Sequence, residues 1–221
     1  MGTLAFDVAH LFAGGLVLIS PVMLLYQDRM TGLINIFTLH AVVLSLSVAW
    51  QAYTQHSPHL FLTAAIAIVF KATIIPLSLQ RIMVRLRIHR DIEVVGGVGV
   101  TMLLGICLVA LSLVVMLPAT AAADPLARED VAFALSVVLL GLLMMVTRRN
   151  AISQVIGFMS LENGLILAAT GAKGMPLVVE ISVAFSVLIA FIVIGIFLFR
   201  IRERFDTVDV QELDRVRGGG R

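Results

Sequence analysis

The chain has 221 residues, of which 60% are hydrophobic and only 14% are charged. A soluble domain usually carries about 45–50% apolar and about 25% charged residues, so this composition excludes an ordinary soluble enzyme. The formal net charge is +2, but the basic residues follow apolar runs and form no patch, which argues against a nucleic-acid partner. The single cysteine, Cys107, offers neither an internal disulfide nor a metal cluster, and we expect it to pack as a small buried hydrophobe.

The hydrophobic pattern predicts an all-α integral membrane protein. A transmembrane helix needs about 20 predominantly apolar residues. About seven segments qualify, and in chain order they cover about residues 4–26, 31–53, 60–83, 94–117, 129–147, 150–172 and 176–200. We therefore predict one transmembrane helical domain over residues 1–204, followed by a polar cytoplasmic tail over 205–221.

The loop charges predict the orientation of these spans. If the C-terminus is cytoplasmic, 13 of the 16 basic residues lie on the cytoplasmic side. Arg128 and Lys173 lie outside, and Lys71 lies within the membrane. Cytoplasmic loops are normally enriched in Lys and Arg. We therefore expect the N-terminus outside, the C-terminus in the cytoplasm and a location in the inner (cytoplasmic) membrane.

Two charged residues lie inside predicted spans, Glu162 in the sixth and Lys71 in the third. A charge in hydrocarbon costs roughly 2.5 kcal/mol or more and usually faces a bundle interior or a water-filled path. We predict that Glu162 and Lys71 are proton-relay groups, since a carboxyl and an amine can both take up and release protons. The alternative is a static ion pair that fixes the register of two helices.

Other polar positions bear on such a path. Pro76 removes a backbone hydrogen bond to the carbonyl of Ala72, beside Lys71, which predicts a kink that either admits water or serves packing alone. His40 in the second span is a further candidate relay group. Glu180, near the outer end of the seventh span, is either a relay group or a carboxylate that reaches the membrane interface.

Helix contacts are also predicted by the sequence. Asp7 and His10 share one face of the first span, which favours a hydrogen-bonded pair with His10 as a possible second relay group. Ser160, Gly164 and Ala168 form a stripe of small residues on the sixth span that lets another helix approach closely. No Ser/His/Asp arrangement and no Cys/His metal spacing occurs in the sequence. We therefore expect no catalytic centre and no cofactor in this chain.

Several motifs resemble those of the hydrogenase-4 component E family. They are Phe70-Lys71 with Pro76 downstream, Arg148-Arg149-Asn150, Gln154-Val155-Ile156-Gly157-Phe158, Leu161-Glu162-Asn163-Gly164, Val179-Glu180-Ile181 and Val216-Arg217-Gly218. These motifs keep their order and spacing from about residue 65 to the end, whereas the first two spans add only hydrophobicity.

The resemblance implies a membrane subunit of a complex I-like [NiFe]-hydrogenase, as in formate hydrogenlyase-type complexes. It implies antiporter-like membrane subunits and hydrogenase subunits as partners, with the [NiFe] centre and iron–sulfur clusters on those partners. The last three spans, residues 129–200, are similar to the K subunit of complex I and to the C component of multisubunit cation/proton antiporters. The two key carboxylates of the K subunit would fall at Met159 and near Val187, so Glu162 and Glu180 do not match them directly.

Three functions stay open at this stage. The first is an accessory subunit that contributes to proton translocation or membrane anchoring in a hydrogenase complex. The second is a subunit of a multisubunit cation/proton antiporter without redox chemistry. The third is a non-conducting scaffold whose charges only hold helices and partners in register.

Overall fold

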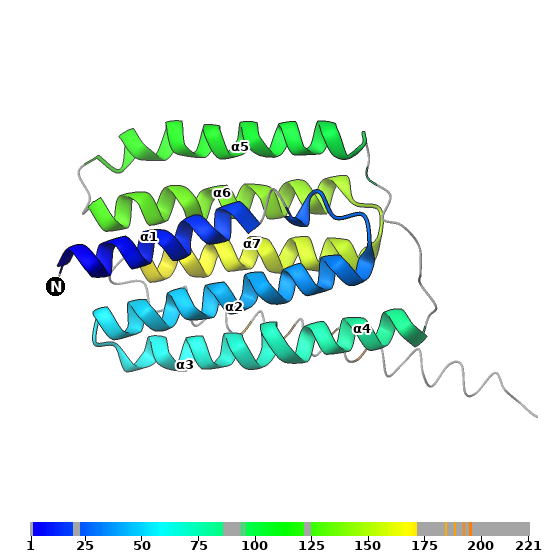
Figure 1. The fold of residues 1–221 in the computed structure, drawn as a ribbon, viewed down its shortest axis with the longest axis horizontal. Coiled ribbons are helices and arrows are strands. Elements are labelled where there is room, and N and C mark those ends of the chain that lie inside the picture. The colour runs from blue at the N-terminus through cyan, green and yellow to red at the C-terminus, as the bar shows by residue number, and fades with distance from the viewer. Residues whose placement is uncertain are drawn as a thin grey trace, which may run out of the picture.

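The computed structural model of the chain describes residues 2–19, 23–85, 94, 96–121 and 125–171, together with the isolated positions 184, 188, 192 and 195. Regular structure in these ranges is helical, apart from one antiparallel bridge between Val94 and Arg148. Figure 1 shows the helices lying alongside one another. Their bounds are α1 (Gly2–Ile19), α2 (Met30–Thr54), α3 (Pro58–Ala67), the π-helix η2 (Ile68–Ile74), α4 (Ile75–Arg85), α5 (Val98–Ala119), α6 (Pro125–Thr147) and α7 (Ala151–Gly171).

The helices α2, α6 and α7 form the centre of the described bundle. α7 packs against both α2 and α6, and α1 packs against α2 and α6. The continuous rod of α3, η2 and α4 covers α2, whereas α5 packs against α6 at the far side of the bundle (Figure 1). A side chain at the middle of α7 can therefore contact more than one helix and lie buried, away from lipid and water.

Five described helices are long and apolar enough to cross a membrane, which makes the chain a multi-pass membrane protein. They cover Met30–Thr54, Pro58–Val84, Val98–Ala119, Asp130–Thr147 and Ile152–Thr170 and correspond to the second to sixth predicted spans. The first predicted span, 4–26, corresponds to α1, which ends at Ile19 and is not one of these five. The seventh, 176–200, lies outside the described residues except for isolated positions.

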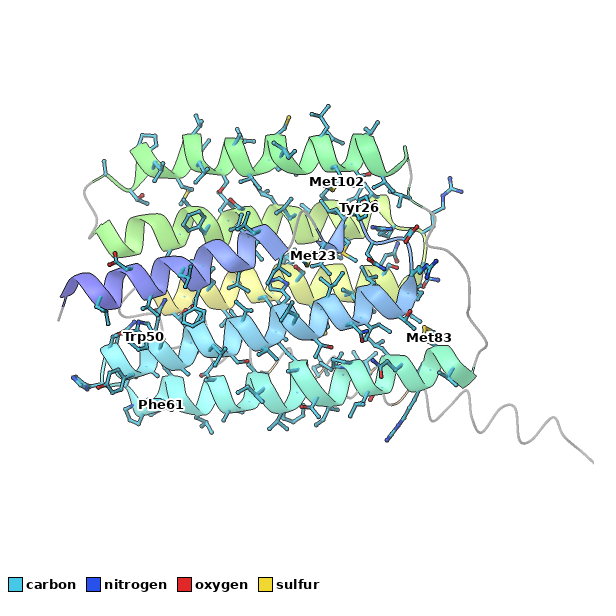
Figure 2. The ribbon with its side chains drawn as sticks, viewed as in Figure 1. Met23, Tyr26, Trp50, Phe61, Met83 and Met102 are labelled. Atoms are coloured by element: carbon cyan, nitrogen blue, oxygen red, sulfur yellow. The ribbon has the colours of Figure 1, made fainter. Side chains whose placement is uncertain are left out.

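The two ends of the bundle differ in their side chains. α2 begins, α4 ends, α5 begins and the α6–α7 turn lies at one end, at the right of Figure 1. We call this the arginine end, because Arg29, Arg81, Arg148 and Arg149 lie there. Trp50 and Phe61 lie at the opposite end (Figure 2), and the ring of Trp50 is 5.9 Å from that of Tyr53. Trp and Tyr commonly lie at membrane–water interfaces, so this end is expected to reach one.

Glycines bring the backbones of α6 and α7 into contact. A Cβ added to Gly141 of α6 would lie 2.5 Å from the backbone nitrogen of Leu161, and one added to Gly164 of α7 would lie 2.8 Å from the carbonyl oxygen of Ala134. Contacts this short leave no space for a side chain. The close approach predicted for Gly164 is therefore present, and its partner is α6.

Candidate functional site

The start of α7 is fixed by a side-chain cap. Asn150 precedes the helix, and its Oδ1 accepts a hydrogen bond of 2.9 Å from the backbone N–H of Ile152. This cap satisfies one of the backbone donors left free at a helix N-terminus. Ser160, Glu162 and Asn163 lie near the middle of the helix that starts there, and all three are buried.

Lys71 lies on η2, the π-helical segment Ile68–Ile74. The hydroxyl of Thr73 donates to the carbonyl oxygen of Ile68, five residues earlier, and the N–H of Ile75 donates to Phe70 in the same spacing. A wide helical turn therefore lies directly before Pro76, where the sequence predicts a kink. Such turns are rare and frequently occur at functional sites.

Lys71 and Glu162 form an ion pair. Lys71 Nζ lies 3.3 Å from Glu162 Oε2 and donates a hydrogen bond of 2.8 Å to Asn163 Oδ1. Lys71 is 1% exposed and Glu162 is 3% exposed. The two charges predicted as relay candidates therefore meet inside the bundle. Asn163, for which the sequence predicted no role, accepts a hydrogen bond from the same ammonium group.

His40 of α2 adjoins this pair. It is fully buried, and its Nδ1 lies 3.5 Å from the hydroxyl oxygen of Ser160. Ser160 lies two residues before Glu162 on α7, so His40 lies beside the turn that carries the carboxylate of the ion pair. The Nε2 atom of His40 is buried and has no hydrogen-bond partner among the residues that the structure describes. We call His40, Lys71, Ser160, Glu162 and Asn163 the polar centre.

Apolar layers enclose the polar centre on both sides. One cluster, on the side of the arginine end, includes Phe37, Ile75 and Met159. The other, toward the opposite end, includes Leu44, Ala64 and Ile166. On α2, on the α3–η2–α4 rod and on α7, the polar residues fall between these two clusters in sequence, so the polar centre lies near the middle of the spans. It lies at the depth where a charge costs most in a membrane.

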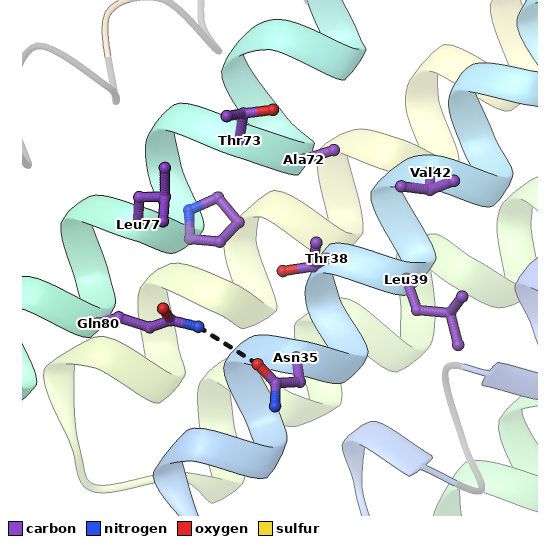
Figure 3. Close-up of a pocket in the computed structure, with 9 residues that line it drawn as sticks. Asn35, Thr38, Leu39, Val42, Ala72, Thr73, Leu77 and Gln80 are labelled. Atoms are coloured by element: carbon purple, nitrogen blue, oxygen red, sulfur yellow. Dashed lines mark hydrogen bonds between the residues drawn. The ribbon is translucent and has the colours of Figure 1, made fainter.

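A groove lies on the other side of η2. It has a volume of about 520 Å³ and runs between α2 and the η2–α4 rod. Figure 3 shows Asn35, Thr38 and Gln80 on its wall, with a hydrogen bond of 3.3 Å from Gln80 Nε2 to Asn35 Oδ1. Ala72 and Thr73 line it, but Lys71 does not. The groove therefore borders the π-helical turn without opening onto the ion pair.

Arg148 is the buried charge that sequence reasoning assigned to a loop. It is 1% exposed, and its Nη2 donates to the carbonyl oxygens of Leu24 at 3.1 Å and Leu25 at 2.7 Å. Burial lowers the pKa of Arg148 from its ordinary value, and the charge of Asp28 opposes that shift. The side chain ties the α6–α7 turn to the segment that precedes α2. The sequence gives no signal that Arg148, and not the exposed Arg149, turns inward.

The remaining predicted positions have different outcomes. Glu180 lies outside the described residues, as does the side chain of His10. Cys107 is exposed on α5, so its predicted burial is wrong: among the described helices, α5 packs mainly against α6. Within the described ranges, no three His, Cys, Asp or Glu side chains are grouped so as to hold a metal ion.

Comparison with known proteins gives distant relatives. The chain is 29% identical over 161 residues to hydrogenase-4 component E of Escherichia coli strain K12, covering 72% of this chain and 74% of that protein. The same protein of Shigella flexneri matches equally. An uncharacterized protein of Mycobacterium tuberculosis is 27% identical over 209 residues, covering 93% of this chain and 94% of that protein. No family model and no solved structure matches the chain.

Proposed function

We propose that this chain is a membrane subunit of a hydrogenase-like complex and that it contributes to proton movement through the membrane. The similarity to hydrogenase-4 component E supports the first part. The observation that carries the second part is the ion pair of Lys71 and Glu162, with both side chains buried at mid-span. In this proposal the [NiFe] centre and iron–sulfur clusters belong to partner subunits, the large membrane partners are antiporter-like, and the complex lies in the inner membrane.

The polar centre has the groups that a relay needs. A proton that passes from Lys71 Nζ to Glu162 Oε2 turns an ion pair into a neutral amine and a neutral carboxylic acid. The 3.3 Å separation is close to direct hydrogen-bond reach. Asn163 accepts a hydrogen bond from the ammonium group of Lys71. His40 places an imidazole nitrogen beside the hydroxyl group of Ser160. Release of the proton from Glu162 and uptake of another by Lys71 restores the ion pair.

A structural role for the same pair is the competing explanation. A buried ion pair fixes which helix faces meet, and its net contribution to stability is often near zero compared with apolar residues of the same size. Both members of this pair are titratable, and a third polar group, Asn163, lies within hydrogen-bond reach of the ammonium group, which supports proton chemistry beside a structural role.

Co-purification tests membership in a hydrogenase-like complex. The chain, tagged at its C-terminus and expressed in its own host, is extracted in mild detergent and purified by the tag. We expect subunits that carry nickel and iron–sulfur clusters, together with hydrogen-dependent reduction of an artificial electron acceptor. The variant Val69→Ala, at an exposed position of the same π-helical segment as Lys71, serves as the matched control and should purify with the same partners. Co-purification of cation/proton antiporter subunits without hydrogen-dependent activity would contradict the proposal.

A further inference from the structure

The helices α2 and α7 run side by side in the same direction and share a line of polar contacts. Ser153 Oγ lies 3.8 Å from Met30 Sδ, and Ser160 Oγ lies 3.5 Å from His40 Nδ1. Toward the other end, Gln55 Nε2 donates a hydrogen bond of 3.0 Å to the carbonyl oxygen of Thr170. Residue numbers rise together on the two helices, so they are parallel, and we call this contact line the α2–α7 seam.

Buried polar residues continue along α2 from the polar centre. Ser47 lies seven residues after His40, and Gln51 lies four residues after Ser47. Positions separated by four or seven residues fall on nearly one face of an α-helix. All three are at most 5% exposed. From His40 to Gln51 the helix rises about 16 Å, which spans the distance from mid-membrane to the end of α2.

The seam ends at a buried carboxylate on a third helix. Gln51 Nε2 donates a hydrogen bond of 3.3 Å to Asp130 Oδ2 of α6, and Gln55 Nε2 donates one of 3.2 Å to Gln51 Oε1. Asp130 is 4% exposed and lies five residues after Pro125, the first residue of α6. The carboxylate therefore lies in the second turn of α6, toward the end of the bundle opposite the arginine end, where Gln51 meets it.

We propose that Asp130 passes protons between the polar centre and the membrane face opposite the arginine end, along His40, Ser47 and Gln51. This proposal rests on the proposed function. Its chemistry is a proton exchange: Asp130 takes a proton from the seam as a carboxylic acid, gives it to water at that face and returns to the carboxylate. A carboxyl group suits this step because it binds and releases a proton without other change. Hydroxyl and amide groups such as Ser47 and Gln51 can hold water in a narrow polar path.

The test uses the whole complex, purified and reconstituted in sealed vesicles, with proton movement and electron transfer measured together. Asp130→Asn should lower proton movement at least tenfold while hydrogen-dependent electron transfer with an artificial acceptor continues. Asp130→Glu keeps the carboxyl group and should restore proton movement to within about twofold. The matched control is Asp28→Asn, which makes the same chemical change at an exposed carboxylate before α2 and should leave proton movement unchanged.

The outcomes separate this proposal from the proposed function. If Asp130→Asn moves protons normally while Glu162→Gln does not, the role of Asp130 is wrong and the role of the polar centre stands. If both variants move protons normally, the relay part of the proposed function fails as well. If Asp130→Asn does not assemble, Gln51→Met is tested in its place. This variant removes the amide group that contacts Asp130 and keeps a side chain of similar length. Normal proton movement in that variant overturns the proposal, and a severalfold loss supports it.

Discussion

Removing the charges of the ion pair one at a time and then together tests whether Lys71 and Glu162 depend on each other. Lys71→Met replaces the ammonium group with an apolar side chain of similar length. Glu162→Gln replaces the carboxylate with a neutral group of the same shape. Both side chains are almost fully buried and lie 3.3 Å apart. Each single variant therefore leaves one buried charge without its counter-charge, whereas the double variant leaves none.

The expected magnitudes follow from these contacts. Breaking a buried pair by removing one partner costs about 3–5 kcal/mol. Removing both charges together changes the free energy of unfolding little, because no buried charge is left without a partner. However, Asn163 Oδ1 loses the hydrogen-bond donor that Lys71 supplies at 2.8 Å. An unsatisfied buried acceptor costs about 1–3 kcal/mol. Independent effects would make the double variant about 7–13 kcal/mol less stable, because Lys71→Met also carries the loss at Asn163, whereas the ion pair predicts a loss of about 1–3 kcal/mol.

The assay is unfolding of the purified chain in mixed detergent micelles, followed by circular dichroism and by fluorescence of Trp50, the single tryptophan. Val69→Ala is the control, because Val69 lies on the same π-helical segment and is 49% exposed. It should change stability by less than about 0.5 kcal/mol. A double variant whose loss of stability equals the sum of the two single losses would refute the paired arrangement.

Three further predictions follow from other features. A reporter fused at the C-terminus should be cytoplasmic and one fused at the N-terminus should be outside; both on one side would contradict seven spans. Lys71→Arg should allow assembly but lower proton movement, because arginine keeps its proton at any working pH; normal pumping would reduce Lys71 to a fixed charge. Gly164→Ala should destabilise the chain by about 1–3 kcal/mol through overpacking against α6. Gly99→Ala on α5, where a Cβ meets open space, should not; equal melting temperatures for these two variants would contradict the tight α6–α7 contact.

The helices were largely predictable because the membrane imposes a simple rule of length and apolarity. The second to sixth predicted spans lie within a few residues of described helices, since each break carries turn or charged residues. The first predicted span, 4–26, overlaps α1, and Met23 and Leu24 beyond it are again helical. The carbonyls of Leu24 and Leu25 accept hydrogen bonds from Arg148. Hydrophobicity alone does not report that contact.

Three members of the polar centre, Glu162, Lys71 and His40, were predicted from the sequence as candidate relay groups. Glu162 and Lys71 stand out because a charge within an apolar run has few explanations other than a buried partner or a polar path. Their pairing was open in sequence, because it depends on how η2 and α7 meet. The role of Asn163 and the contact of Ser160 with His40 were not predicted, because polar uncharged residues are common in membrane-spanning helices. The spacing of His40, Ser47 and Gln51 was visible in the sequence, but its meaning depends on which face of α2 turns toward α7.

The measurement that tests the central claim most directly is the proton-to-electron ratio of the purified, reconstituted complex that carries Glu162→Gln. The substitution keeps the shape of the side chain and removes its titratable proton. If Glu162 relays protons, electron transfer from hydrogen should continue in detergent with an artificial acceptor, while the number of protons moved per electron in sealed vesicles falls sharply. A ratio equal to that of the unmodified complex would contradict the relay and leave the ion pair with Lys71 a structural role alone.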